Sequence, residues 1–334
     1  MSKILITGGA GFIGSNLCEF FVNKGHEVIC LDNFSTGHMY NIQHLVNNKT
    51  NFKLIEGDIR NFDTCLKATK NIDYVLHEAA LGSIPRSIND PITTNDVNIG
   101  GFLNMLVAAR DSNIKRFIFA ASSSTYGDSQ EIPKVEDRIG KPLSPYALTK
   151  YVDELYADVF ANTYGIEYIG LRYFNVFGRR QDPESMYAAV IPLFIKQLMS
   201  HKCPHINGDG SITRDFTYID NVIKMNLLAI NTTDKATINQ IYNTAVGEQT
   251  SILQMTNLLI KYLSKYDKDI KLIRPEFGLP RQGDIKQSIA SIEKAKKLLA
   301  YQPDFSFEKG LEETISWYWS NNKQLTNIED VATM

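Results

Sequence analysis

The sequence has few cysteines, and none of them stand at a spacing typical of paired cysteines. Cys18, Cys30, Cys65 and Cys203 are the four in a chain of 334 residues, and they are scattered along it. Two of them fall within an expected first helix and second strand, where a free thiol serves as a small core residue. This pattern excludes a disulfide framework and predicts a reduced, cytoplasmic protein.

The chain also lacks long apolar runs, an excess of charge and a clear metal-ligand set. No apolar stretch approaches the roughly 18 residues that span a bilayer, and no basic, apolar leader precedes the first expected strand. We therefore expect a soluble protein without membrane contact. The net charge of −2 offers no general attraction for nucleic acid. His201, Cys203 and His205 are interrupted by Pro204 and have no fourth ligand nearby, so we expect no metal site.

Apolar strand candidates alternate with helical patterns through the first half of the chain. The strand candidates lie at 3–7, 27–31, 52–56, 73–77, 116–121 and 167–171, and the long helix candidates at 91–112 and 145–164. This alternation predicts an α/β fold whose residues 1–178 form a doubly wound parallel Rossmann sheet. The pattern loosens after residue 178, so residues 179–334 are expected to form a smaller mixed α/β substrate lobe. A segment at about 214–243 is the candidate for a return to the sheet.

A glycine-rich turn follows the first expected strand. Gly8, Gly11 and Gly14 stand in Gly-x-x-Gly-x-x-Gly spacing, directly before and within a helical pattern. Glycines there allow a tight turn and let the backbone approach a pyrophosphate at the helix amino terminus. Asp32 ends the second strand, where a carboxylate accepts hydrogen bonds from ribose hydroxyls. No arginine directly follows Asp32 to receive a 2′-phosphate, so the motif favours NAD over NADP.

A second chemical signal lies where the fifth expected strand ends. Ser122, Ser123 and Ser124 follow the apolar run 116–121, and Tyr146 and Lys150 come later. On a helix, a four-residue step stacks tyrosine and lysine on one face, and the cation lowers the pKa of the phenol from about 10. Alone, this pair is also typical of an amphipathic helix surface. Serines at the carboxyl edge of a parallel sheet favour an active site with the phenol as base.

These motifs together resemble the extended short-chain dehydrogenase/reductase family and, within it, the nucleotide-sugar epimerases. The resemblance runs from Gly8 to about Trp319, and its carriers are 8–14, 32–37, 58–59, 77–80, 122–124, Tyr146 with Lys150, 172–178 and 281–284. Ser122 is not followed by the Asp-Glu pair of sugar dehydratases, and the nearby glutamate of decarboxylating relatives is absent. The resemblance therefore implies oxidation and re-reduction at one sugar carbon, C4.

The resemblance also implies a mechanism and a tightly bound NAD. Tyr146, as phenolate, takes the proton of the sugar 4-hydroxyl while hydride leaves for the nicotinamide, and Lys150 keeps the phenolate ionised. Ser122 hydrogen-bonds the sugar oxygen, with Ser123 and Ser124 as alternatives. The 4-keto sugar then turns over and takes the hydride back on its other face. The implied NAD-binding residues are Gly8, Gly11, Phe12, Ile13, Gly14, Asp32, Asn33, Ser35, Thr36, Gly37, Asp58, Ile59, Ala79, Ala80, Asn98, Tyr146, Lys150 and Tyr173.

The resemblance places cations at the uridine diphosphate and a small residue at the sugar. Arg214 and Arg281 match positions that grip the diphosphate, with solvated surface arginines as the alternative reading. Ser288 stands where hexose-only relatives carry a tyrosine and leaves room for a 2-acetamido group, unless it is a plain exposed residue. The implied substrate-binding residues are Ser83, Arg86, Ser122, Ser123, Asn175, Tyr187, Ala188, Val190, Asn207, Arg214, Arg281, Asp284 and Ser288.

The expected reaction is the 4-epimerisation of UDP-GlcNAc and UDP-GalNAc. One alternative substrate pair is the corresponding UDP-N-acetylhexosaminuronic acids. Ser83, Arg86 or Arg180 would bind the carboxylate of these sugars. A second alternative is UDP-glucose and UDP-galactose. An alternative of another class is a non-catalytic NAD-binding regulatory protein, against which the intact tyrosine, lysine and serine argue.

We also expect a homodimer, because helices 91–112 and 145–164 resemble the pair that forms a dimer interface in this family. That interface would bury Phe102, Leu106, Leu155 and Val159. The three- and four-residue spacing of these side chains fits an internal core face equally well.

Overall fold

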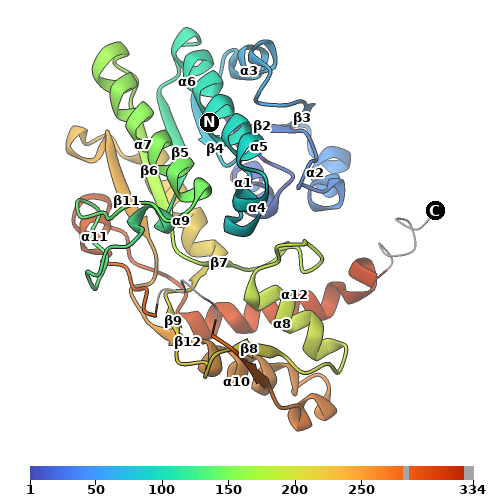
Figure 1. Cartoon of the computed structure of the whole chain (residues 1–334). Coiled ribbons are helices and arrows are strands. Elements are labelled where there is room, and N and C mark those ends of the chain that lie inside the picture. The colour runs from blue at the N-terminus through green and yellow to red at the C-terminus, as the bar shows by residue number, and fades with distance from the viewer. Residues whose placement is uncertain (281–285, 327–334) are drawn as a thin grey trace.

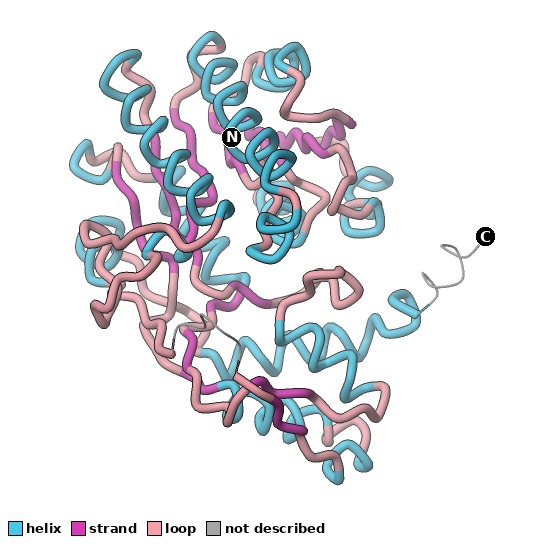
Figure 2. Tube along the Cα trace, in the orientation of Figure 1, coloured by secondary structure: helices cyan, strands magenta, loops and turns pink. Residues whose placement is uncertain are grey.

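The computed structural model describes residues 1–280 and 286–326, and a seven-stranded parallel sheet forms the centre of these ranges (Figures 1 and 2). The strand order is β11-β6-β5-β4-β1-β2-β3, and every pair is parallel. The strands are β1 (Lys3–Thr7), β2 (Glu27–Asp32), β3 (Phe52–Glu56), β4 (Tyr74–His77), β5 (Arg116–Ser122), β6 (Tyr168–Tyr173) and β11 (Gln240–Thr244).

Helices cover both faces of the sheet, so its strands are apolar on both sides. In β1, Ile4 and Ile6 pack into one buried cluster, whereas Leu5, which points to the other face, packs into a second. The first cluster includes residues of α1 (Phe12–Asn23) and α9 (Ile219–Asn231), and the second includes residues of α3 (Phe62–Thr69), α6 (Gly101–Asp111) and α7 (Pro145–Tyr164). The predicted α/β class with a doubly wound sheet is confirmed.

The 20-residue helix α7 carries the tyrosine and the lysine. The Ser144 side chain caps it by accepting a hydrogen bond from the Ala147 backbone N–H at 3.1 Å, and Pro145 occupies the first turn, where its missing N–H costs nothing. Gly165 ends the helix in the left-handed region, at φ 75°. These signals fix the first turn, and therefore the positions of Tyr146 and Lys150, relative to β5.

Most elements after β6 form a smaller lobe, which lies below the sheet in Figure 1. Its strands pair two by two, β10 with β7, β12 with β9 and β13 with β8. Between them α9 and β11 return to the sheet, where β11 pairs with β6. The lobe elements are β7 (Val176–Phe177), α8 (Val190–Met199), β8 (His205–Asn207), β9 (Thr213–Arg214), β10 (Thr217–Tyr218), β12 (Thr250–Ser251), α10 (Ile252–Leu263), β13 (Glu276–Gly278) and α12 (Phe307–Thr326).

Short elements connect these layers. The α-helices are α2 (Gln43–Asn48), α4 (Ile84–Asn89), α5 (Pro91–Asn95) and α11 (Glu293–Leu299). Residues Asp96–Gly100 form one π-helical turn between α5 and α6, and 3₁₀ turns lie at Met39–Asn41, Ser123–Tyr126, Lys235–Thr237 and Lys268–Leu272. Across the described ranges, every helix is too short or too polar to cross a bilayer.

The residues expected at a dimer interface divide into two groups. Phe102 and Leu106 are fully buried within the sheet-face core of a single chain. Leu155 and Val159, on α7, are 48% and 54% exposed. The internal alternative for the first pair is therefore correct, and only the second pair remains on a surface.

Candidate functional site

A cavity of about 310 Å³ opens at the carboxyl ends of β1 to β4, where the sequence predicts the cofactor. It is lined by Gly8, Gly11, Phe12, Ile13, Gly14, Leu31, Asp32, Asn33, Ser35, Thr36, Gly57, Asp58, Ile59, Glu78, Ala79, Ala80, Leu81, Gly82, Arg86, Val97 and Ser185. The lining thus contains most of the predicted NAD-binding residues. Gly37, Asn98, Tyr146, Lys150 and Tyr173 are predicted for the cofactor but are not part of this lining.

The glycine turn fits a dinucleotide because it has no room for side chains. Gly8 has φ +65°, and a Cβ there would lie 2.9 Å from the Ala79 backbone. A Cβ on Gly14 would lie 2.2 Å from the Gly8 carbonyl oxygen. Gly11, the N-cap of α1, provides no side-chain cap, so the first N–H groups of the helix remain available at the cavity. Such a helix end suits a diphosphate.

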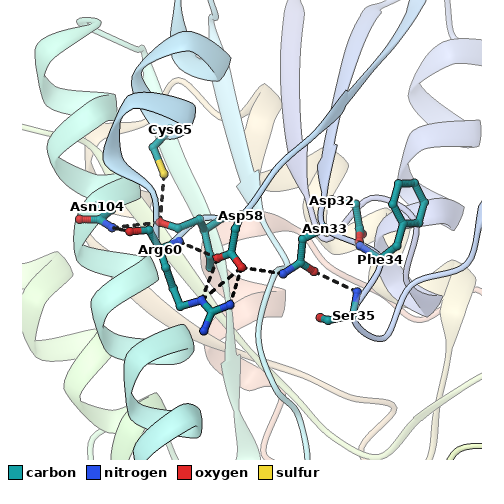
Figure 3. Close-up of polar contacts among 9 residues, drawn as sticks. Asp32, Asn33, Phe34, Ser35, Asp58, Arg60, Cys65 and Asn104 are labelled. Carbon is teal, nitrogen blue, oxygen red and sulfur yellow. Dashed lines mark hydrogen bonds and ion pairs between the residues drawn. The ribbon is translucent and has the colours of Figure 1, made fainter.

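An acidic, hydrogen-bonded cluster lies at the end of the cavity where the sequence predicts the adenosine ribose (Figure 3). Asp32 accepts hydrogen bonds from the backbone N–H of Ala10 and of Phe34, both at 2.8 Å. Asn33 donates to Asp58 at 2.8 Å, and Arg60 binds the same carboxylate at 2.7 Å. The hydrogen bonds from Arg60 lower the pKa of Asp58 to about 2. Sequence reasoning missed Arg60, but Asp58 already compensates its charge, so the preference for NAD over a 2′-phosphate stands.

Lys150 joins α7 to the strand that ends in the serines. Its ammonium donates to the Ala120 carbonyl at 2.9 Å and to the Asp153 carboxylate at 3.4 Å, and it is 3% exposed. Tyr146 lies one turn earlier on the same helix and is half-buried. The helix therefore brings the lysine to the carboxyl end of β5, two residues before Ser122.

Among the three serines, Ser122 is the one that the local hydrogen bonds orient. Its Oγ accepts from the backbone N–H of Ser124 at 3.1 Å and from the Ser124 hydroxyl at 2.8 Å. With two bonds accepted, the hydroxyl proton of Ser122 is left to donate to another oxygen. Ser123 and Ser124 begin the 3₁₀ turn and are half-buried. This geometry favours Ser122 as donor and Ser124 as its support.

Glu78 is a cavity residue that sequence reasoning did not select. The Tyr173 hydroxyl donates to its carboxylate at 2.8 Å, and Asn226 donates to the Tyr173 oxygen at 2.9 Å. Burial raises the pKa of Glu78 to about 7. Its sequence signal is a carboxylate directly after a buried strand that neighbours the glycine turn. Tyr173 therefore contacts the cavity through this glutamate.

Asn98 ties the loop after β4 to α7. It accepts from the Leu81 backbone N–H at 2.8 Å and donates to the Thr149 hydroxyl at 3.0 Å, and it is 1% exposed. This residue, predicted to bind the cofactor, is thus hydrogen-bonded to two other residues of the protein, Leu81 and Thr149. It holds Leu81, a cavity residue, in place.

The predicted substrate residues near α4 are engaged with one another. The Ser83 hydroxyl caps α4 by accepting from the Arg86 backbone N–H at 3.2 Å. The Arg86 guanidinium lies 5.4 Å from the centre of the Tyr187 ring, and Asn89 donates to the Tyr187 hydroxyl at 3.3 Å. These contacts link α4 to the segment that enters α8. The chain thereby closes one side of the cavity with residues distant in sequence.

A second group of predicted substrate residues lies in the lobe. Arg214 is in β9, and Ser288 donates its backbone N–H to the carbonyl of Thr213 at 3.3 Å, so Ser288 lies beside β9 at the residue before Arg214. Asn175, at φ 34°, donates to the Asp215 carbonyl at 3.0 Å. Ala188 precedes α8, Val190 begins it, and Asn207 ends β8. Arg281 and Asp284 lie outside the described residues.

Comparison with known proteins defines the family. Residues 4–245 match the model of the NAD dependent epimerase/dehydratase family. The chain belongs to this family. Because its relatives are named as 4-epimerases, the chain is an NAD-dependent nucleotide-sugar epimerase, and the glycine turn, Asp32 and the acidic cluster fit that cofactor.

Three related proteins align with nearly the whole length of this epimerase. A putative UDP-glucose 4-epimerase of Methanocaldococcus jannaschii is 36% identical over 322 residues, which are 96% of this chain and 99% of the relative. A UDP-N-acetylglucosamine 4-epimerase from Methanobrevibacter ruminantium M1, solved with UDP-N-acetylmuramic acid, has TM-score 0.88 at 37% identity and covers 96% of this chain and 99% of its own. A Bacillus cereus UDP-glucuronic acid 4-epimerase, solved with UDP-glucuronic acid and NAD, has TM-score 0.86 at 34% identity and covers 95% and 99%.

Proposed function

We propose that this UDP-sugar 4-epimerase interconverts UDP-GlcNAc and UDP-GalNAc. The three related proteins described above are all named as UDP-sugar 4-epimerases, and one of them acts on UDP-GlcNAc. The observation that carries the choice of sugar is Ser288, a small residue beside β9 and Arg214. The family resemblance places this position against the sugar, where a serine leaves space for a 2-acetamido group.

Each polar group in the site has a task in this reaction. NAD, when bound, accepts the C4 hydride and returns it. Tyr146 takes and returns the proton of the 4-hydroxyl, and Lys150, fixed by the Ala120 carbonyl, favours the ionised phenol. Ser122 donates to the same sugar oxygen, because Ser124 occupies its acceptor sites. Arg214 provides charge for the diphosphate.

A 6-carboxylated sugar is the second candidate, and Arg86 is the observation that favours it. Arg86 lines the cavity and has no acidic partner among residues 1–280 and 286–326. Arg180, the other cation considered for such a carboxylate, is instead bound to Glu19 at 2.9 Å. Of these two cations, Arg86 is therefore the one placed to receive an additional anionic group.

Incubation with parallel UDP-sugars distinguishes these candidates. Purified enzyme, without added cofactor, is expected to convert UDP-GlcNAc to UDP-GalNAc faster than it converts UDP-glucose or UDP-GlcNAc uronic acid, as read by proton NMR. Turnover without added NAD also requires nucleotide to appear in the ultraviolet spectrum of the denatured protein. Faster turnover of UDP-glucose contradicts the acetamido preference, and turnover of the uronic acid alone selects the Arg86 reading.

We also propose that a second copy of the chain covers the exposed apolar side of α4, α5 and α7. Apolar side chains with exposures from 47% to 74% lie on these helices: Ile84, Ile88, Ile92, Leu148, Leu155 and Val159. Monomeric proteins rarely expose many such groups on adjacent elements. A second copy would bury them against their own counterparts, as isologous dimers do.

Light scattering tests this dimer. The parent protein at micromolar concentration is expected to show twice the chain mass, and Leu155→Asp with Val159→Asp is expected to show the monomer mass, since two buried charges oppose association. Leu272→Asp, at a 75% exposed position in the lobe, is the matched control and should remain dimeric. A monomeric parent contradicts the proposal.

A further inference from the structure

Asp153 is a buried carboxylate in direct contact with Lys150. It lies three residues further along α7 and is fully buried, and one of its oxygens accepts from the Lys150 ammonium at 3.4 Å. The other oxygen has no hydrogen-bond partner in the described part of the chain. A buried carboxyl with a half-satisfied hydrogen-bonding capacity is costly, which calls for a role beyond packing.

Asp153 is the direct counter-charge of Lys150. Glu154, the adjacent acid, is bound by Arg172 through two hydrogen bonds of 2.8 and 2.7 Å, so its charge is compensated separately. His77, the last residue of β4, and Glu78, directly after it, also interact electrostatically with the lysine. Burial lowers the pKa of His77 to about 3, so this ring is neutral near pH 7. From β5, the Ala120 carbonyl contributes only a dipole.

We propose that Asp153 is a positioning residue that holds the Lys150 ammonium at the end of β5 and offsets its charge, thereby setting the pH range in which Tyr146 is the base. The proposal rests on the proposed function, because the role of Tyr146 comes from it. It adds a residue that acts on the reaction through the lysine alone.

The sign of the effect follows from the charges. Burial raises the pKa of Asp153 to about 7, so the carboxyl changes charge near neutral pH. When Asp153 is ionised, the lysine–aspartate pair is nearly neutral and favours the phenolate less. When Asp153 is neutral, the full positive charge of Lys150 acts on Tyr146 and favours the phenolate more. A neutral residue at position 153 also withdraws the anion that stabilises Lys150 as a cation.

Asp153→Asn is therefore expected to move both limbs of the kcat/KM against pH profile to lower pH, by about one unit. The matched control is Asp158→Asn, which removes one charge from an exposed position on the same helix and should leave both limbs in place. Asp153→Glu retains the charge and should keep limbs close to those of the parent. If Asp153→Asn lowers kcat/KM equally at every pH and leaves both limbs of the pH profile in place, the proposal is wrong.

A second readout separates this proposal from the proposed function. The phenolate absorbance of Tyr146 is obtained from pH titrations of NAD-loaded protein. The curve of the variant with Tyr146→Phe is subtracted from the curve of the otherwise identical protein that retains Tyr146. Asp153→Asn is expected to lower the midpoint of that difference curve, again by about one unit. This measurement requires no turnover, so it decides the role of Asp153 even if no UDP-sugar reacts. An unchanged midpoint overturns the proposal.

Discussion

Tyr146→Phe is expected to reduce UDP-sugar turnover by about 10³-fold while the protein retains bound NAD. Phenylalanine preserves the ring and the helix but has no oxygen to accept the 4-hydroxyl proton. The loss should fall on chemistry and not on folding, because the Tyr146 hydroxyl makes no hydrogen bond within the described residues and the side chain is half-buried. The measurement is kcat with UDP-GlcNAc, together with the nucleotide released on denaturation.

Tyr151→Phe is the matched control for this variant. Tyr151 lies on the same helix with a similar partial exposure, so the control removes a hydroxyl from α7 without removing the base. It should keep parental turnover. If Tyr146→Phe also keeps it, the base assignment is wrong. If the parent itself turns over no UDP-sugar while it holds NAD, the non-catalytic NAD-binding alternative becomes the better explanation.

Gly14→Ala is expected to abolish retention of NAD and to lower stability. The added Cβ would lie 2.2 Å from the Gly8 oxygen and 2.8 Å from the Gly9 Cα, and both are backbone atoms that cannot rotate away. The turn must open, which costs about 1–3 kcal/mol and displaces the helix end that faces the diphosphate. The measurements are nucleotide content after denaturation and the shift in Tm.

Gly100→Ala provides the control for an added methyl group. This glycine lies in the π-helical turn before α6, and a Cβ there would meet no atom within 4 Å. Alanine also has the higher helix propensity, so Tm should hold or rise and NAD should remain bound. Equal behaviour of the two alanine variants would mean that the close approach at Gly14 is not what shapes the cofactor site.

Local patterns predicted the elements that carry the chemistry. The expected helix 145–164 coincides with α7, because serine, proline and the final glycine are strong local start and stop signals. The expected apolar runs also coincide with strands of the parallel sheet, because strands buried on both faces are continuously apolar. The family resemblance then supplied the cofactor and the reaction class.

The contacts at the site between residues distant in sequence could not be predicted from local sequence patterns. Glu78 meets Tyr173 across 95 positions in the chain, and Arg86 stacks on Tyr187 across a similar span. Phe102 and Leu106 show the ambiguity most clearly, because their spacing fits a core and an interface equally and only packing placed them in the core. A periodic pattern identifies an apolar face but not its partner.

The sequence by itself determined the α/β fold, the glycine turn with Asp32, and the order of serine, tyrosine and lysine, because these depend on residues close together in the chain. Only the tertiary structure decided that Lys150 has Asp153 as its counter-ion, that Ser124 orients Ser122, and that Glu78 lines the cavity. The physical reason is that a local spacing allows a contact without fixing its burial or its partner: Asp153 is one turn after Lys150 and Ser124 is two residues after Ser122, but burial decides that these pairs form. That burial arises only when strands and helices distant in sequence pack together, and it changes the charge of the enclosed groups.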